Sequence, residues 1–376
     1  MRRARLPTFA GALAILTAAG WADEGHHGGS TGLFPHAIAV ADVDGDGIPD
    51  VLIPASAERK VAVLLGDGKG GFRANHAFPV GQGPTWIVAA DVNGDRHLDF
   101  VTTDTGAHRL TIYFGDGRGG FAPGKVIPDI DGPVSVVVAD FNRDGRLDLA
   151  VAQAAESQVA ILTNRGSGTF EVATRYRVDR GPHILVTEDV NGDKLPDLVV
   201  GTLGAHKLTI LLGKGDGSFD RRPSVETGRF PHYMAFLDWN GDGHKDLAVA
   251  VAGEDAVDLL AGDGRGGFTR GSRLKAGVNP HGLVAVDVNG DRILDLVVSN
   301  RSTHDLMIYL GTGRGFSAPK LIRTGQDIIA LGTADFDRDG RVDLALVSAS
   351  HNVVVILRGD GAGGFATGAA SAGPVK

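Results

Sequence analysis

Cysteine is absent from this sequence of 376 residues. Disulfide bonds therefore cannot stabilise the fold, whatever the compartment. Long apolar runs are also missing, since none reaches the ~18 residues that a membrane-spanning helix needs. The apolar segments show no helical periodicity over a useful length. Glycine, in contrast, accounts for 56 residues, and 43% of the chain is apolar. This combination predicts many short strands joined by tight turns.

Residues 1–22 have the pattern of a signal peptide. Arg2, Arg3 and Arg5 precede an uncharged apolar stretch, and Gly20-Trp21-Ala22 ends it with small residues on either side of the tryptophan. A buried N-terminal strand is the alternative, but the basic head before an uncharged core favours export. We expect residues 23–33 to form a flexible leader and the protein to be secreted or periplasmic, although the paired arginines are only a poor match to the twin-arginine pattern.

One pattern, D-x-[DN]-x-D-x-x-x-D, occurs seven times in residues 34–376. Its copies begin at Asp42, Asp91, Asp140, Asp189, Asp238, Asp287 and Asp335, which are 49 residues apart except for a last step of 48. Glycine-rich segments keep the same period and end at Phe72, Phe121, Phe170, Phe219, Phe268, Phe316 and Phe365. Seven copies leave no room for another domain, so residues 34–376 are predicted to form one repeat domain.

Each repeat is predicted to contain four short strands. In the fourth repeat these are Pro182–Glu188, Leu198–Gly201, Leu208–Leu212 and a more polar outer segment at 219–228, which is expected to be the weakest strand of the four. Four strands in a repeat of this length indicate an all-β fold, a seven-bladed β-propeller with four antiparallel strands per blade. Residues 366–376 can supply the last strand of the seventh blade, so the ring can close without borrowing an N-terminal strand, although residues 23–34 could overlap that edge.

The aspartate loops are candidate calcium sites. Calcium takes six to eight oxygen ligands at flexible geometry, and a tight loop can offer four side chains (positions one, three, five and nine) and the carbonyl of position seven. Up to seven calcium ions are expected, with weaker binding where asparagine replaces aspartate at position three. The alternative is a turn capped by its own aspartate and asparagine side chains. The candidate ligands, loop by loop, are Asp42, Asp44, Asp46, Ile48 and Asp50; Asp91, Asn93, Asp95, His97 and Asp99; Asp140, Asn142, Asp144, Arg146 and Asp148; Asp189, Asn191, Asp193, Leu195 and Asp197; Asp238, Asn240, Asp242, His244 and Asp246; Asp287, Asn289, Asp291, Ile293 and Asp295; and Asp335, Asp337, Asp339, Arg341 and Asp343.

The loop pattern, the following "DLVV" strand and the "LLGDGKGGF" turn resemble the FG-GAP/VCBS repeats of integrin α-subunit propellers and of many bacterial exported proteins. The resemblance covers residues 34 to about 370. It implies a seven-bladed propeller with calcium in the hairpin between the first and second strands of each blade. It also implies side-chain coordination by the first, third, fifth and ninth loop residues. Function is not implied, because such propellers serve adhesion, carbohydrate binding and occasionally catalysis.

Eight of the thirteen histidines occupy two positions of the repeat. His36, His183, His232 and His281 start inner strands, and His108, His206, His304 and His351 lie between the second and third strands. Both positions belong to the end of the blades opposite the aspartate loops. Neutral imidazoles that converge there suit a transition metal or an acidic ligand. The alternative is inheritance, with Pro-His as a packing element and the second histidine replacing an amide that bonds a turn. His97 and His244 would coordinate through their carbonyls only.

Two functions are compatible with these features. The first is an exported calcium-binding propeller that acts as a binding or adhesion module for a glycan or protein ligand. The alternative is an enzyme, a lyase or a metal-dependent oxidase, that uses the histidine-lined channel mouth. An enzyme needs a matched acid and base or a metal with an open position, and the sequence offers histidines with Arg109 and Arg301 nearby. We therefore favour the binding module, and expect a monomer that binds no nucleic acid.

Overall fold

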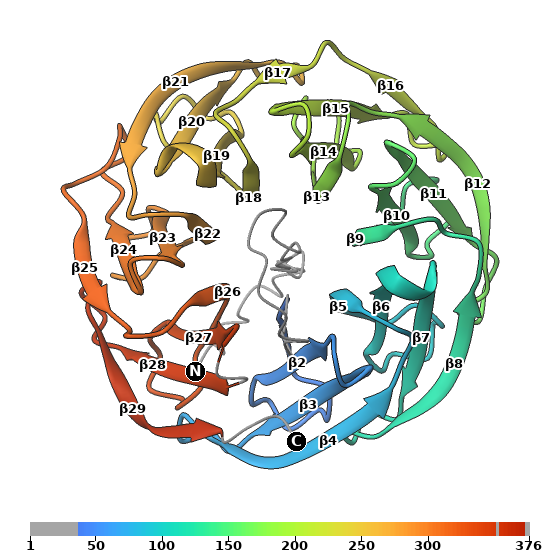
Figure 1. The fold of residues 1–376 in the computed structure, drawn as a ribbon, viewed down its shortest axis with the longest axis horizontal. Coiled ribbons are helices and arrows are strands. Elements are labelled where there is room, and N and C mark those ends of the chain that lie inside the picture. The colour runs from blue at the N-terminus through green and yellow to red at the C-terminus, as the bar shows by residue number, and fades with distance from the viewer. Residues whose placement is uncertain (1–36, 351–352, 373–376) are drawn as a thin grey trace, which may run out of the picture.

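Each repeat folds into one antiparallel sheet whose strands pair in chain order, and seven such sheets surround a central axis (Figure 1). The computed structural model describes residues 37–350 and 353–372. The expected all-β, seven-bladed propeller with four antiparallel strands per blade is confirmed. The predicted signal peptide (1–22) and leader (23–33) lie outside the described residues, as do His36 and His351.

The two inner strands of each blade flank the aspartate loop. The innermost strands are β1 (Ala39–Ala41), β5 (Pro84–Ala90), β9 (Pro133–Ala139), β13 (Pro182–Glu188), β18 (Pro231–Leu237), β22 (Pro280–Val286) and β26 (Ile328–Ala334). The second strands are β2 (Asp50–Ala55), β6 (Asp99–Asp104), β10 (Asp148–Gln153), β14 (Asp197–Thr202), β19 (Asp246–Val251), β23 (Asp295–Asn300) and β27 (Asp343–Ser348). The ninth loop residue is thus the first residue of every second strand.

The two outer strands complete each blade. The third strands are β3 (Lys60–Gly66), β7 (Arg109–Gly115), β11 (Gln158–Asn164), β15 (Lys207–Gly213), β20 (Ala256–Gly262), β24 (Asp305–Tyr309) and β28 (Val353–Gly359). The outermost strands are β4 (Phe72–Pro79), β8 (Phe121–Ile127), β12 (Phe170–Arg177), β16 (Phe219–Arg221) with β17 (Val225–Glu226), β21 (Phe268–Lys275), β25 (Lys320–Arg323) and β29 (Phe365–Ala372). Two short 3-10 turns, η1 (Thr105–Ala107) and η2 (Ala252–Glu254), lie between second and third strands.

Burial follows the position of each strand in its blade. Every residue of the seven second strands is buried, because both faces of these strands pack against neighbouring blades. After their first aspartate, most of these strands are accordingly short apolar runs rich in valine, leucine and alanine. The outermost strand β12, in contrast, has no fully buried residue. The hydrophobic core therefore lies between the blades.

The outermost strand of blade four is interrupted. β16 pairs with the end of β15 and β17 pairs with its beginning. Pro223 lies between the two segments, and proline has no N–H to donate to a ladder. This break agrees with the expectation that residues 219–228 form the weakest strand of the repeat.

Blade seven closes the ring on blade one without exchanging a strand. β29 pairs with β28, and β1 to β4 form their own sheet, as expected. The amide of Gly70 donates to the carbonyl of Phe336 (3.0 Å). The same bond joins blade four to blade three, from Gly217 to Phe141, at 2.9 Å. The closing junction is therefore built like an internal one.

Two arginines of blade seven reinforce this closure. The guanidinium of Arg338 donates to the carbonyl of Asp46 (2.9 Å), and that of Arg358 donates to the carbonyl of Lys69. Within the described part of the chain, no helix is both long and apolar enough to cross a bilayer.

Candidate functional site

The aspartate loops are wound by hydrogen bonds from their own backbone. In blade four both carboxylate oxygens of Asp189 accept amide protons, from Gly192 (2.7 Å) and Lys194 (2.8 Å). The side-chain oxygen of Asn191 accepts the amide of Asp193 (2.9 Å). Equivalent bonds recur in the first loop and the seventh. The self-capped turn that the sequence allowed is therefore present. It does not compete with a cation, because each carboxylate oxygen has a second lone pair.

The aspartate at position nine of each loop, here called the ninth aspartate, is buried and holds the loop against the third strand. In blade four Asp197 accepts the amides of Val190 (3.0 Å) and Gly213 (2.7 Å), one on each carboxylate oxygen. The corresponding pair of bonds occurs in the other six blades. Sequence reasoning missed this second role. A glycine or asparagine sixteen residues after each ninth aspartate was the available signal.

Burial raises the pKa of all seven ninth-position aspartates. The pKa reaches about 6 for Asp50, Asp99 and Asp197, and it is also raised in the other four blades. Desolvation is the largest cause, partly offset by the two amide hydrogen bonds, and neighbouring loop carboxylates raise the pKa further. An ionised carboxylate in this position is therefore costly without a cation.

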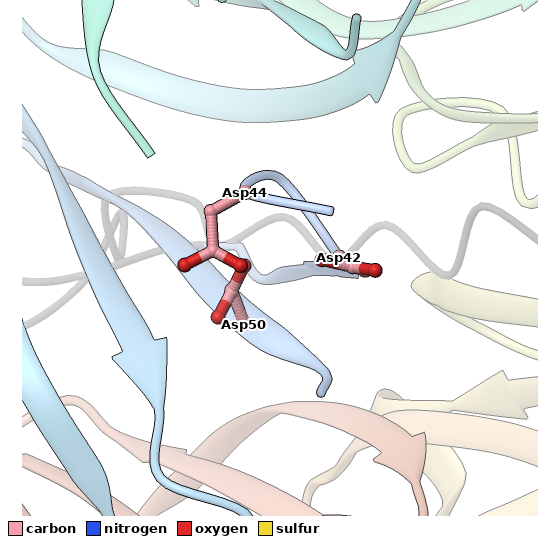
Figure 2. A group of neighbouring side chains, drawn as sticks. All are labelled: Asp42, Asp44 and Asp50. Atoms are coloured by element: carbon pink, nitrogen blue, oxygen red, sulfur yellow. The ribbon is translucent and has the colours of Figure 1, made fainter. Parts of the chain in front are cut away.

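Carboxylate oxygens converge in the two loops that keep aspartate at position three. Ligand atoms of Asp42, Asp44 and Asp50 all lie within 4.8 Å of one another, and those of Asp335, Asp337 and Asp343 do so too. Figure 2 shows the first of these groups on the loop between β1 and β2. Among the described residues these are the two groups of three acidic or histidine side chains that meet so closely. An all-oxygen donor set of this kind fits calcium.

Cationic or amide groups of the protein face the third and fifth positions. Arg73 pairs with Asp44 and, at 2.9 Å, with Asp46. In the seventh loop, Nε of Arg358 lies 3.3 Å from a carboxylate oxygen of Asp337. In four loops the asparagine at position three donates its side-chain N–H to the fifth aspartate. A cation that entered the first loop would compete with Arg73.

The residues at position seven contribute no side-chain oxygen. The ring of His97 lies over Gly117 so closely that a Cβ on that glycine would be 2.2 Å from Nδ1, and His244 lies over Gly264 in the same way. Both rings pack on the following glycine turn. Their carbonyls, like those of Ile48, Arg146, Leu195, Ile293 and Arg341, stay the predicted ligands.

Three histidines lie side by side where the inner strands of blades four, five and six begin. The ring centroids of His183 and His232 are 5.3 Å apart, and those of His232 and His281 are 4.5 Å apart. We call this end of the ring the Pro-His face, after Pro182-His183, Pro231-His232 and Pro280-His281. The expected adjacency is confirmed.

Burial keeps the imidazoles of His232 and His281 uncharged. His183 and His281 are only 1% and 2% exposed. Burial first, and then the charge of Arg301, lowers the pKa of His232 to about 4. The pKa of His281 is lowered well below its usual value, again mainly by burial. Nδ1 of His281 donates to the carbonyl of Ile329 in blade seven (3.2 Å), so at least this ring ties two blades together. Its role as a ligand stays a prediction, and the packing role that the sequence left open is present.

The second set of histidines bonds turns. His108, His206 and His304 have φ of 53°, 58° and 57°, in the left-handed region. Nδ1 of His108 accepts the amide of Gly132, and Nδ1 of His206 accepts that of Phe230, both at 3.2 Å. In blade five the carboxylate of Asp255 takes this role and accepts the amide of Asn279 in the next loop. The histidines therefore replace other turn-bonding residues.

A cavity of about 740 Å³ lies at the other end of the inner strands. Leu185, Met234 and Leu283 form part of its apolar wall, and Glu188 and Lys194 line it near the aspartate loops. The sequence placed the ligand at the Pro-His face and gave no signal for this cavity, because cavity walls depend on how the blades meet.

Comparison with known proteins agrees with this architecture. The FG-GAP-like repeat matches residues 55–102, 91–151, 189–249, 238–298 and 287–346, and the FG-GAP repeat matches residues 34–72. No curated protein matches the sequence.

Solved structures share the fold at low sequence identity. BBS1N in complex with ARL6DN has a TM-score of 0.62 at 15% identity, over 85% of this chain and 91% of that one. An Agrocybe aegerita lectin that recognises non-reducing terminal N-acetylglucosamine has a TM-score of 0.56 at 17% identity, over 85% and 87%. Streptogramin B lyase has a TM-score of 0.57 at 14% identity, over 85% and 92%. Likeness at these identities extends to the fold alone.

Proposed function

Because the chain belongs to the FG-GAP repeat family, we propose that it is an exported calcium-binding propeller that binds a glycan or protein on its Pro-His face. Export is supported by the signal-peptide pattern of residues 1–22. A ligand-binding role is supported by two neighbours of the same fold, one in complex with a protein and one that recognises a sugar.

The convergence of carboxylates around a buried aspartate carries the calcium part of the proposal. Asp42, Asp44 and Asp50 bring three carboxylates within 4.8 Å of one another, where like charges repel strongly. A divalent cation would relieve this repulsion and the cost of ionising buried Asp50. The five loops with asparagine have one carboxylate fewer, so we expect them to bind more weakly.

The metal content of the purified protein tests this proposal. In equilibrium dialysis against millimolar calcium, we expect several bound calcium ions per chain and at most seven. Asp193→Ala should lower the count by one, because it removes the fifth-position ligand of a single loop and leaves the other loops intact. Retention of no calcium by the wild-type protein, or an unchanged count in Asp193→Ala, would contradict the assignment of these loops.

A further inference from the structure

Phe230 has a backbone conformation that is unusual for a bulky residue. Its φ is 58°, in the left-handed region where a Cβ is crowded. Blades two, three and four have Gly83, Gly132 and Gly181 at this position, all with positive φ, so the fold does not require an aromatic residue there. The Phe230 side chain is nevertheless 46% exposed. Its ring packs edge-on against that of His206, with centroids 5.1 Å apart, but nearly half of the residue stays exposed, and strain retained for an exposed side chain points to function.

Val278 lies on the neighbouring loop, between blades five and six. It is 47% exposed, and its carbonyl accepts the amide of Ser302 (3.2 Å). The other exposed large apolar side chains of the described residues are Val126 and Leu321 on outer strands and Leu294 in an aspartate loop. Phe230 and Val278 are therefore the two exposed large apolar residues on loops that precede inner strands, at the Pro-His face.

Arg301 brings a positive charge to the same place. Its amide donates to the carbonyl of Asn279 (3.0 Å), and its charge acts on both His232 and His281, whose pKa values it lowers. Arg109 and Arg229 pair with Asp104 and Glu254. For Arg301, in contrast, no carboxylate of the described residues lies within 4.0 Å.

Asp327 is the carboxylate that shares these surroundings. It accepts hydrogen bonds from the hydroxyls of Ser348 (2.9 Å) and Ser350 (2.6 Å). Burial opposes its ionisation, but these bonds and the charge of Arg301 outweigh burial and lower its pKa. Asp327 is thus held by the serines and not by a direct ion pair with Arg301, so the guanidinium can still bind an external anion.

His232 supplies a polar group between the apolar pair and the arginine. It follows Phe230 by two residues and is half-buried. Its Nδ1 is buried and has no hydrogen-bond partner. Buried ring nitrogens without a partner are costly and rare in folded proteins.

We propose that Phe230, His232, Val278 and Arg301, here called the mouth patch, bind a carboxylated sugar such as the uronate unit of an acidic polysaccharide. The inference rests on the proposed function, since it specifies the ligand of the Pro-His face. The planar guanidinium of Arg301 binds a carboxylate through paired hydrogen bonds. The Phe230 ring stacks on the C–H face of the sugar, with Val278 beside it. The imidazole of His232 hydrogen-bonds a hydroxyl.

The mouth patch favours this ligand over the two other classes. A transition metal at the three histidines would bind next to the unpaired charge of Arg301, which repels cations. A protein partner needs about 800 Å² on each side of a stable interface, whereas two exposed apolar side chains around one cation suit a single sugar unit.

Calorimetric titration of the calcium-loaded, exported chain with trigalacturonate tests the inference. We expect wild type to bind trigalacturonate and not the neutral galactose trimer. Phe230→Gly and Arg301→Gln should each weaken binding at least roughly tenfold, because each removes one recognition element. Phe230→Gly should also melt at the same temperature or higher, since it restores the residue that blades two to four carry.

Two substitutions on the same face serve as controls. Asn279→Gly changes the equivalent left-handed position of the next blade, and Arg59→Gln removes an exposed cation from blade one. Both should bind trigalacturonate as wild type does. Binding of a neutral glycan or a protein, without trigalacturonate, would retain the proposed function and overturn this inference. Trigalacturonate binding that survives both patch substitutions but is lost in Met234→Arg would place the ligand in the channel cavity and would also overturn it.

Discussion

The ninth aspartate of each loop differs from the other predicted ligands in what it holds together. Asp197 accepts two backbone amides with its two oxygens, whereas Asp193 is exposed and accepts one, from Leu195. An asparagine at 197 could accept only one of the two amides, and its own N–H₂ would face the other. We expect Asp197→Asn to lower the free energy of unfolding by about 1–3 kcal/mol even in EGTA.

Asp193→Asn is the matched control, because its remaining oxygen can still accept the amide of Leu195 and only the exposed bond from Asn191 is lost. It should weaken calcium binding and change stability in EGTA much less than Asp197→Asn does. Urea unfolding of both variants, with and without calcium, measures how much each substitution changes the free energy of unfolding. Equal stability of the two variants in EGTA would show that the paired hydrogen bonds of Asp197 contribute nothing.

The sequence predicted the site residues that recur at the same position of each repeat. It did not predict those that occur in one repeat only. The aspartates and the adjacent histidines repeat with the blade period, so topology alone placed them. Phe230 is an exception to its repeat position, and its left-handed backbone is visible only in the structure. The partners of His206 and His281 lie in neighbouring loops or blades, and a repeat pattern does not specify such contacts.

At the scale of strands and blades the sequence was more informative. The predicted strand Pro182–Glu188 matches β13, and the weak segment 219–228 matches the broken pair β16 and β17. Turn residues and apolar runs determine such boundaries locally. The closure of the ring by Arg338 and Arg358 was not predicted, because the acceptor carbonyls belong to blade one.

These two arginines give a prediction about the blade junction. We expect the double substitution Arg338→Ala and Arg358→Ala to lower the free energy of unfolding by about 2 kcal/mol, since each removes an exposed hydrogen bond worth about 1 kcal/mol. Hydrogen exchange should rise mainly in blades one and seven. Arg265→Ala, in the turn between the third and fourth strands of blade five, is the control. Faster exchange spread evenly over all blades would argue against a local closing role.

The stability of the whole molecule depends on the negative charge at one end of the ring. The seven loops hold 23 of the 45 acidic residues, and all lie at the end opposite the Pro-His face. If each loop binds calcium near ~100 μM, calcium at about 1 mM contributes roughly 1.4 kcal/mol per site and about 10 kcal/mol over seven sites. This would brace a fold that has no cysteine for disulfides.

The dependence of this effect on pH tests it most directly. Burial raises the pKa of the ninth aspartates from 3.8, to about 6 in three of them. A carboxyl whose pKa is higher in the folded chain stabilises the fold while protonated, and that contribution is lost as the pH rises through the folded pKa. Without calcium we therefore expect these groups to lower the melting temperature between about pH 4 and pH 6.

Calcium should cancel this loss, because it stabilises the ionised carboxylates. His232 works in the opposite direction, since burial lowers its pKa from 6.5 to about 4 and its stabilising contribution is lost as the pH falls. It lies at the far end of the blades, so its contribution is the same with and without calcium and disappears in the difference. Melting curves in calcium and in EGTA should thus diverge from about pH 4 upwards and differ most near neutrality. Coincident curves at neutral pH would mean that the loops are turns stabilised by their own amides, with no calcium needed to brace the ring.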